Sequence, residues 1–208
     1  MPLTDSVQLI VWSDYLCPWC HLGARRVRRL EEEFGDALRV EWRAFLLRPT
    51  PDAMRTLERF RAYTQSWLRP AAEPDAPEFR PWTTGEGPPS HSIPAHLVAK
   101  AAAAVGAEAF RGMHDRLLRA YFVENRDITR TEIQYLLWRD LGLADAAFAV
   151  AGAAETRAAV LADHQDAVER GVTGVPALML AGNDVPTLGA MPYETYRRWI
   201  ARALRGEI

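Results

Sequence analysis

Residues 8–20 read QLIVWSDYLCPWC, and this stretch decides the fold of the chain. The apolar run at 8–12 predicts a short buried strand. Pro18 suits the first position of a helix, because its missing N–H would be unpaired there anyway. Apolar side chains then recur at helical spacing as far as Phe34, and apolar and polar residues alternate over 38–45. The stretch therefore opens a strand–helix–strand unit, with the cysteines where the first strand passes into the helix.

Cys17 and Cys20 are the only cysteines in the sequence, and two residues separate them. In a reducing compartment such a pair is more often catalytic or metal-binding than a structural disulfide. The first sulfur would lie at the helix N-terminus, where unpaired N–H groups and the helix dipole stabilise a thiolate. The second would lie one turn inside the helix and be shielded. This asymmetry predicts that Cys17 is the attacking nucleophile and Cys20 the resolving thiol.

Zinc binding is the alternative interpretation of this pair. Zinc needs four ligands, and the sequence has no second C-x-x-C. His91 and His96 could complete a Cys₂His₂ set, but they lie in a proline-rich stretch. We therefore expect thiol chemistry, no metal, and no cofactor beyond a redox-active disulfide between Cys17 and Cys20.

Helical patterns fill the middle of the chain. Residues 49–170 are predicted to form an all-helical insertion, with helices at 52–68, 93–105, 108–122, 129–141, 145–152 and 155–170. Within it, the proline- and glycine-rich residues 69–90 predict a long mobile loop.

Strand signals return after the insertion. A hairpin is predicted from 177–181 and 185–188, and an amphipathic helix follows Pro192. The order βαβ, helical block, ββα predicts one sheet built from residues 1–48 and 171–208. Residues 49–170 interrupt it as a separate helical domain.

Length and composition narrow the class of protein. The chain has 208 residues, of which 49% are hydrophobic and 25% charged, an ordinary globular composition. With a net charge of −2, the chain lacks the excess of basic residues that a general nucleic-acid binder carries. No apolar run reaches the roughly 18 residues of a membrane helix, and residues 1–6 lack the basic start of a signal peptide. We expect a cytoplasmic protein with no nucleic-acid or membrane partner.

Several motifs together resemble the DsbA-like thioredoxin-fold proteins, and the FrnE-type branch most closely. They are the C-P-W-C after a first strand, Ser13-Asp14, Ala120-Tyr121-Phe122, Gly171-Val172-Thr173-Gly174-Val175-Pro176 and Gly189-Ala190-Met191-Pro192. The resemblance covers about residues 7–204 and implies an α/β, thioredoxin-like fold with a large all-helical insertion. One departure is Met191, where the family usually has Gln.

The resemblance also implies roles for single residues. Pro176 would be the family's cis-proline, facing the first cysteine, and Val175 would offer backbone groups to an extended substrate segment. Pro18 and Trp19 would tune the redox potential. Trp19 either contacts substrate or packs on the insertion. The residues themselves leave two roles open for Asp14, which either relays a proton or caps the loop before the helix.

The helix predicted over 18–34 carries further charged residues whose roles are open. Arg25-Arg26 and Arg28-Arg29, answered by Glu31-Glu32-Glu33, predict a solvated face with ion pairs one turn apart. His21 either faces solvent or helps to stabilise the thiolate.

These observations predict a thiol–disulfide oxidoreductase acting on disulfides of proteins or of small-molecule thiols, with glutathione as an optional co-substrate. In a reducing cytoplasm it would reduce or isomerise disulfides rather than form them. The alternative enzyme is a glutathione-dependent isomerase or transferase, of the 2-hydroxychromene-2-carboxylate isomerase or kappa class. Those generally carry a serine in place of the first cysteine, so Cys17 favours redox chemistry. A third hypothesis is a non-enzymatic redox sensor. Separately, the insertion's surface helices could support a homodimer.

Overall fold

The computed structural model describes residues 6–52 and 54–208. Residues 1–5, on which the expectation of a chain without a signal peptide partly depends, lie outside the described part. The sheet has four strands in the order β2-β1-β3-β4. They are β1 (Val7–Ser13), β2 (Leu38–Ala44), β3 (Ala177–Leu180) and β4 (Thr187–Leu188). β1 pairs parallel with β2 and antiparallel with β3, so the sheet is mixed.

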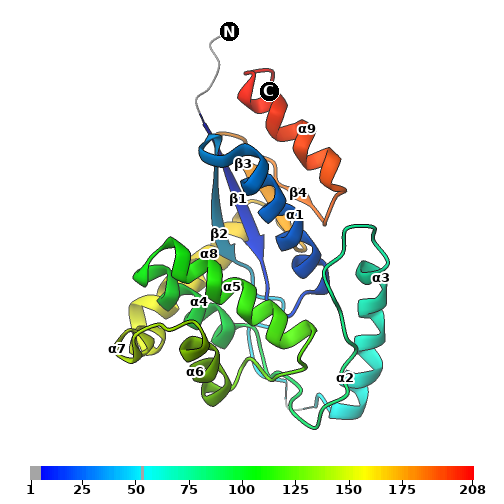
Figure 1. Ribbon diagram of the computed structural model, residues 1–208, viewed down its shortest axis with the longest axis vertical. Helices are drawn as coiled ribbons and strands as arrows, with labels where there is room; N and C mark the ends of the chain where they lie inside the picture. The colour runs from blue at the N-terminus through cyan, green and yellow to red at the C-terminus, as the bar shows by residue number, and fades with distance from the viewer. Residues whose placement is uncertain (1–5, 53) are drawn as a thin grey trace.

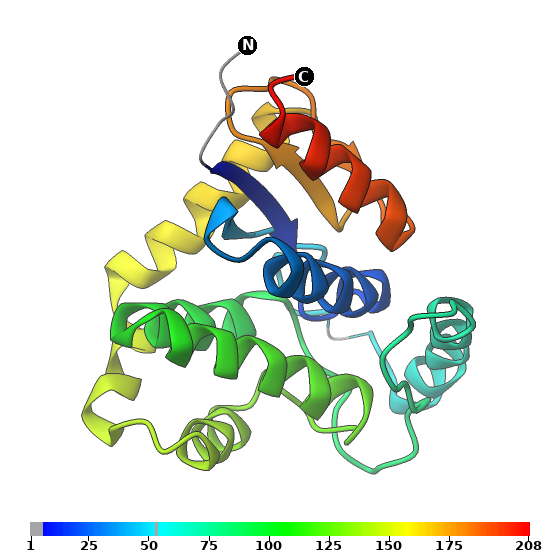
Figure 2. The same ribbon diagram turned by 45° about the horizontal axis from the view of Figure 1, so that its top comes forward.

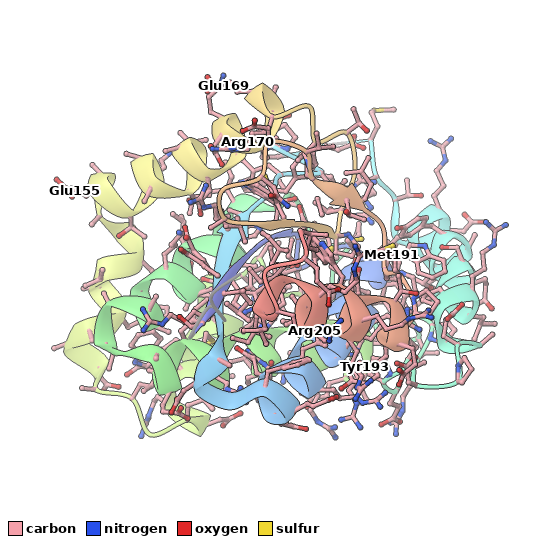
Figure 3. The ribbon with its side chains drawn as sticks, turned by 90° about the horizontal axis from the view of Figure 1, so that it is seen from above. Glu155, Glu169, Arg170, Met191, Tyr193 and Arg205 are labelled. Atoms are coloured by element: carbon pink, nitrogen blue, oxygen red, sulfur yellow. The ribbon has the colours of Figure 1, made fainter. Side chains whose placement is uncertain are left out.

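Helices cover both faces of this sheet. α1 (Pro18–Phe34) and α9 (Tyr193–Leu204) pack on the face that buries Leu9 and Val11. α8 (Ala154–Glu169) covers the opposite face, which buries Ile10 and Trp12. Figure 3 shows α8 and α9 on opposite sides of the strands, with Met191 and Tyr193 marking the start of α9. Because both faces are covered, β1 is continuously apolar from Leu9 to Trp12 instead of alternating.

The chain between β2 and α8 is a helical insertion. Its helices are α2 (Leu57–Thr64), α3 (Leu68–Ala71), α4 (Ile93–Val105), α5 (Ala107–Phe122), α6 (Thr131–Asp140) and α7 (Asp145–Phe148). Figures 1 and 2 show α4–α7 as one group, whereas α2 and α3 stand apart, beside the end of α1 at which its first residues lie. The architecture confirms the predicted α/β thioredoxin-like fold with a helical insertion. No helix in the described part of the chain has both the length and the apolar character to cross a bilayer.

The start of the insertion differs from the prediction. The helix expected over 52–68 begins only at Leu57, because the Thr56 side chain caps it by accepting from the Arg59 backbone N–H at 3.3 Å. A 3₁₀ turn at Gln65–Trp67 then separates α2 from α3.

Residues 72–92 lack regular structure, apart from turns and bends, but they are held in place. Trp82 is 2% exposed. Its backbone N–H donates to Thr64 Oγ1 at 2.9 Å, and its ring Nε1 donates to the Glu86 carbonyl at 2.9 Å. The segment predicted to be a mobile loop is therefore packed against the insertion through a buried aromatic ring.

Of the four arginines at 25–29 in α1, Arg25 is exposed and Arg29 partly exposed, but the other two are buried. Arg26 is 1% exposed and Arg28 is also buried. Arg26 donates to Asp75 at 2.6 Å and to the carbonyls of Ala190 and Met191 at 2.8 and 3.0 Å. This one side chain therefore links α1, the insertion and the segment before α9. The prediction of a solvated face was therefore wrong for Arg26 and Arg28, because acidic residues distant in sequence pair with them. The predicted ion pairing one turn apart is present between Arg28 and Glu31, at 2.8 Å.

Candidate active site

Cys17 is the N-cap residue of α1, and Pro18 is the first helical residue. The chain turns between β1 and α1, and the Cys17 backbone N–H donates to the Asp14 carbonyl at 3.1 Å. The Cys17 side chain is nearly buried, and its Sγ donates to the carbonyl of Val175 at 3.3 Å. Both cysteines are free thiols in this structure. The structure thus places the first sulfur at a helix N-terminus, against the loop that precedes β3.

Cys20 lies one turn inside α1 and has no solvent exposure. Burial raises the pKa of the Cys20 thiol well above its usual value, and a hydrogen bond to Cys17 and the charge of Cys17 raise it further. The Asp14 backbone N–H, 3.5 Å from the sulfur, and the Ser13 hydroxyl act in the opposite direction. Cys20 is therefore held as a neutral thiol while Cys17 is reduced.

The Val175–Pro176 loop faces this helix end. The peptide bond between the two residues is cis. Pro176 packs so closely on α1 that a Cβ on Gly23 would lie 3.0 Å from the Pro176 Cγ. The Pro176 carbonyl accepts from the Gly189 N–H at 2.7 Å. The loop is therefore held by α1 on one side and by the segment after β4 on the other.

Asp14 is completely buried beneath the motif. Its carboxylate accepts from the Leu16 N–H at 2.7 Å and from the Leu47 N–H at 2.8 Å. Burial raises the pKa of Asp14, against the hydrogen bonds from Ser92 and these two backbone groups and the charge of Arg48. The carboxylate thus ties the loop before α1 to the chain after β2, which favours a loop-capping role over proton relay.

Trp19 and His21 flank the cysteines differently. Trp19 is 37% exposed, so it presents part of its ring beside Cys17. The His21 ring stacks on Phe122 at a centroid distance of 5.0 Å and lies 3.3 Å from the Glu78 carbonyl. Burial lowers the pKa of His21 to about 4, so the ring is neutral at pH 7 and gives no positive charge to a thiolate.

A tyrosine close to the first cysteine, and two arginines close to that tyrosine, were missed in the sequence. Burial raises the pKa of Tyr63 in α2, and the negative charge of a Cys17 thiolate raises it further. Arg48 and Arg55 interact electrostatically with Tyr63 and with each other. One signal existed for Arg48: parallel strands end at the same sheet edge, so the residues after β1 and after β2 must meet there.

The histidines considered as zinc ligands lie elsewhere. His96 is buried, and its ring lies 4.9 Å from that of Tyr15. The His91 Nδ1 and the Ser90 hydroxyl share a hydrogen bond of 2.8 Å. Across residues 6–52 and 54–208, no three His, Cys, Asp or Glu side chains gather in a group that could hold a metal ion.

The sequence matches one protein-family model, described as a DSBA-like thioredoxin domain, over residues 8–201. No curated protein sequence gives a significant match.

Solved structures share the fold. A protein from Nitrosomonas europaea, provisionally named a protein disulfide isomerase, is 20% identical, with a TM-score of 0.80 and coverage of 98% of this chain and 100% of that chain. The cytosolic disulfide reductase DsbM from Pseudomonas aeruginosa is 21% identical, with a TM-score of 0.72 and coverage of 95% and 98%. It is also known in a structure with GSH. A 2-hydroxychromene-2-carboxylate isomerase is 17% identical, with a TM-score of 0.64 and coverage of 96% and 97%. At these identities the likeness shows the fold alone.

Proposed function

Because the chain belongs to the DSBA-like thioredoxin domain family, we propose that it is a thiol–disulfide oxidoreductase in which Cys17 attacks and Cys20 resolves. The observation that carries this proposal is the asymmetry of the two thiols. Cys17 caps α1 and contacts the Val175 carbonyl, whereas Cys20 is fully buried one turn behind it. Only the first sulfur can be reached by a substrate without opening the helix end.

The reaction follows from this arrangement. The Cys17 thiolate attacks one sulfur of a substrate disulfide, forms a mixed disulfide and releases the other half of the substrate as a thiolate. Cys20 then loses its proton to the departing thiolate and attacks Cys17 Sγ, which releases the second half. A Cys17–Cys20 disulfide remains, and two electrons have passed to the substrate. A thiol of the glutathione type is proposed to return them.

The environment of Cys20 sets the order of these steps. While Cys17 is reduced, its hydrogen bond and charge help to keep Cys20 protonated. Formation of the mixed disulfide consumes the charge on Cys17 and so removes both effects. The Ser13 hydroxyl and the Asp14 N–H remain to stabilise the developing thiolate. Cys20 thus becomes a better nucleophile only once a substrate is attached.

We also propose roles for the residues around the cysteines. Val175 would pair through its backbone with an extended substrate segment, beside Pro176. Pro18 and Trp19 would set the redox potential, because both adjoin the reacting sulfurs. The partly exposed Trp19 would contact the substrate.

The narrower assignments are proposals as well. Membership of the FrnE-type branch rests on the C-P-W-C motif, Ser13-Asp14 and Ala120-Tyr121-Phe122. A cytoplasmic location and a reductase or isomerase direction are supported by the presence of a single cysteine pair and by the fold shared with a cytosolic reductase. The domain division at 48/49 and 170/171, and a homodimer through the insertion, stay predictions that limited proteolysis and size-exclusion chromatography can test.

A glutathione redox titration tests the function. The wild type should lose two free thiols reversibly, with a midpoint between about −270 and −120 mV. The Cys20→Ser variant should instead trap one glutathione on Cys17, visible by mass spectrometry, and Cys17→Ser should not turn over a disulfide. Absence of an intramolecular disulfide, or retained turnover by Cys17→Ser, would contradict the assignment and favour glutathione-dependent isomerisation or transfer.

A further inference from the structure

The thiol of Cys20 has no solvent exposure, yet it must lose a proton before it can attack. The Asp14 backbone N–H lies 3.5 Å from the Cys20 sulfur, and the residue joined to that N–H is Ser13. Ser13 is buried at the end of β1, on the same face as Val11, against which α1 packs. Its hydroxyl forms a hydrogen bond with the Cys20 thiol. A hydroxyl group therefore lies next to the resolving sulfur, inside the protein.

A small cavity adjoins this hydroxyl group. It has a volume of about 20 Å³, and Ser13 forms part of its wall. The rest of the wall comes from β2, α4 and α5 and includes Trp42, His96, Ala99 and Lys100. A cavity needs about 10–15 Å³ of such volume to hold one water molecule. There is therefore room for a single water beside Ser13.

Two buried polar atoms of the cavity wall have no hydrogen-bond partner within the described residues. They are Nε2 of His96 and Nε1 of Trp42. Burial lowers the pKa of His96 to about 3, although a hydrogen bond to the Phe45 backbone opposes this shift, so the ring is neutral at pH 7. A buried water makes about three hydrogen bonds to polar groups that would otherwise be unpaired. The Ser13 hydroxyl, the His96 ring and the Trp42 N–H are three such partners.

The cavity adjoins a groove on the protein surface. This groove has a volume of about 430 Å³ and shares Trp42, Lys100 and Phe110 with the wall of the cavity. These three residues are half-buried, whereas Ser13 is buried, so the cavity lies between the groove and the hydroxyl group. Lys100 pairs with Asp163 at 2.6 Å, which offsets its positive charge at the passage. Water in the groove can therefore exchange protons with water in the cavity.

We propose that one water in this cavity carries the proton of Cys20, through the Ser13 hydroxyl, to solvent when Cys20 attacks the mixed disulfide. The inference rests on the proposed function and adds a proton path to it. The Cys20 sulfur bonds to Cys17 Sγ while the bond from Cys17 to the substrate sulfur breaks. Ser13 takes the thiol proton and passes its own to the water, which gives one to the solvent. The substrate leaves with the electron pair as a thiolate, and the released thiolates take up protons from solvent. His96 and Trp42 are positioning residues for the water.

Dithiobis(nitrobenzoate) can test this path by stopped-flow absorbance, because each thiolate that it releases is coloured. Attack by Cys17 releases the first thiolate at a rate proportional to reagent concentration, and attack by Cys20 releases the second at a rate independent of it. Ser13→Ala should leave the first phase unchanged and slow the second roughly a hundredfold, the lower end of the range for positioned proton transfer. Ser13→Thr keeps the hydroxyl group and should retain most of the second-phase rate.

Variants in the cavity wall separate the path from a direct effect of the hydroxyl on the sulfur. Ala99→Val adds two methyl groups at the cavity and should exclude the water, so only the second phase should slow. Trp42→Phe removes one partner of the water without adding volume and should act in the same direction. Ala104→Val makes the matched change at an exposed position of α4 and should alter neither phase. A crystal structure of the wild type should show a water bonded to Ser13 Oγ, absent from Ala99→Val.

An unchanged second phase in both Ala99→Val and Trp42→Phe would overturn the inference even if Ser13→Ala is slow, because the hydroxyl would then act on the sulfur alone. Equal slowing of both phases in these variants would also overturn it. Failure of the proposed function gives a different result. In that case the wild-type protein itself would release no second thiolate.

Discussion

Asp14 is a carboxylate that has no contact with solvent, and its position explains how two loops are joined. It accepts backbone N–H groups from Leu16, on its own loop, and from Leu47, after β2. Its own N–H faces the Cys20 sulfur. One residue therefore fixes the turn that leads into the cysteines and supplies a donor to the buried thiol. Its raised pKa is the cost of burying a charge at that point.

This predicts a pH dependence of stability that belongs to Asp14. Between the usual pKa of 3.8 and the higher folded-state pKa, the folded chain holds a proton that the unfolded chain has lost. The stability due to Asp14 is therefore fully present below pH 3.8 and falls as pH rises through this window, by up to about 1.4 kcal/mol per unit. Urea unfolding at pH 4 to 7 should show the wild type losing free energy of unfolding relative to Asp14→Asn.

Asp166→Asn provides the matched control. Despite partial burial, hydrogen bonds from Arg170 and Arg43 lower the pKa of Asp166. Its contribution is then fully present above pH 3.8 and is lost only in stronger acid, so the difference from wild type should stay level from pH 4.5 upwards. If the difference in free energy of unfolding between Asp14→Asn and the wild type also stays level over this pH range, burial does not destabilise the Asp14 carboxylate.

Among the helices, α1 is central to the site, because its N-terminal end provides both cysteines and its first two turns contact the Val175–Pro176 loop. Cys17 and Cys20 lie on its first turn, and Gly23, on the second, allows the Pro176 ring to approach. A glycine inside a helix costs about 0.5–1 kcal/mol relative to alanine. Its presence here is explained by the close contact with Pro176 and not by helix propensity.

Gly23→Ala should therefore destabilise the protein although alanine favours helices. The new Cβ would lie 3.0 Å from Pro176 Cγ and 3.3 Å from its Cβ, and overpacking of this kind costs about 1–3 kcal/mol. After the helix gain, a net loss of about 1 kcal/mol is expected in urea unfolding, together with slower disulfide exchange. Gly152→Ala, at a site with nothing within 4 Å, should change neither. A stabilised and fully active Gly23→Ala would refute the contact.

The helices and strands differ in how far local sequence predicts them. The bounds of α4 match the prediction, and those of α5 do so within one residue, because apolar periodicity and flanking glycines act locally. The start of α2 was missed because a Thr56 cap outweighed the continuing apolar pattern. The burial of Trp82 could not be predicted, since its partner Thr64 is 18 positions away.

At the scale of the whole molecule, the site is assembled from segments that the sequence separates widely. The C-P-W-C motif and the Val175–Pro176 loop were identified from local residues, but their contact spans 158 positions. Tyr63 carries no local mark of function, because a tyrosine close to the reacting sulfur looks like any other tyrosine in a sequence. Likewise, the charge pattern of α1 is the same whether Arg26 faces solvent or the insertion.

Arg26 links three of these widely separated segments, namely α1, the insertion and the residues before α9. It pairs with Glu73 and Asp75 of the insertion and with the carbonyls before α9. Arg26→Met should therefore lower the free energy of unfolding by about 2 kcal/mol, less than for a fully buried pair because both acids keep some exposure. Hydrogen exchange should rise in residues 72–78 and 189–192 together.

The control is Arg25→Met, which removes an exposed arginine from the same helix and should change stability by less than about 0.5 kcal/mol. Faster exchange in only one of the two segments after Arg26→Met would show that the side chain does not couple them.

The hydrogen bond from Cys17 to the Val175 carbonyl makes this carbonyl sensitive to the chemical state of the sulfur. The thiol proton rests on a peptide oxygen, so ionisation, alkylation or oxidation of the sulfur each leaves that oxygen without its donor. The ¹³C resonance of the Val175 carbonyl should therefore shift at every step in which Cys17 takes part. Isotope labelling of this single backbone atom would give a native reporter, able to follow the chemistry of the unmodified protein in real time without a dye or a mutation.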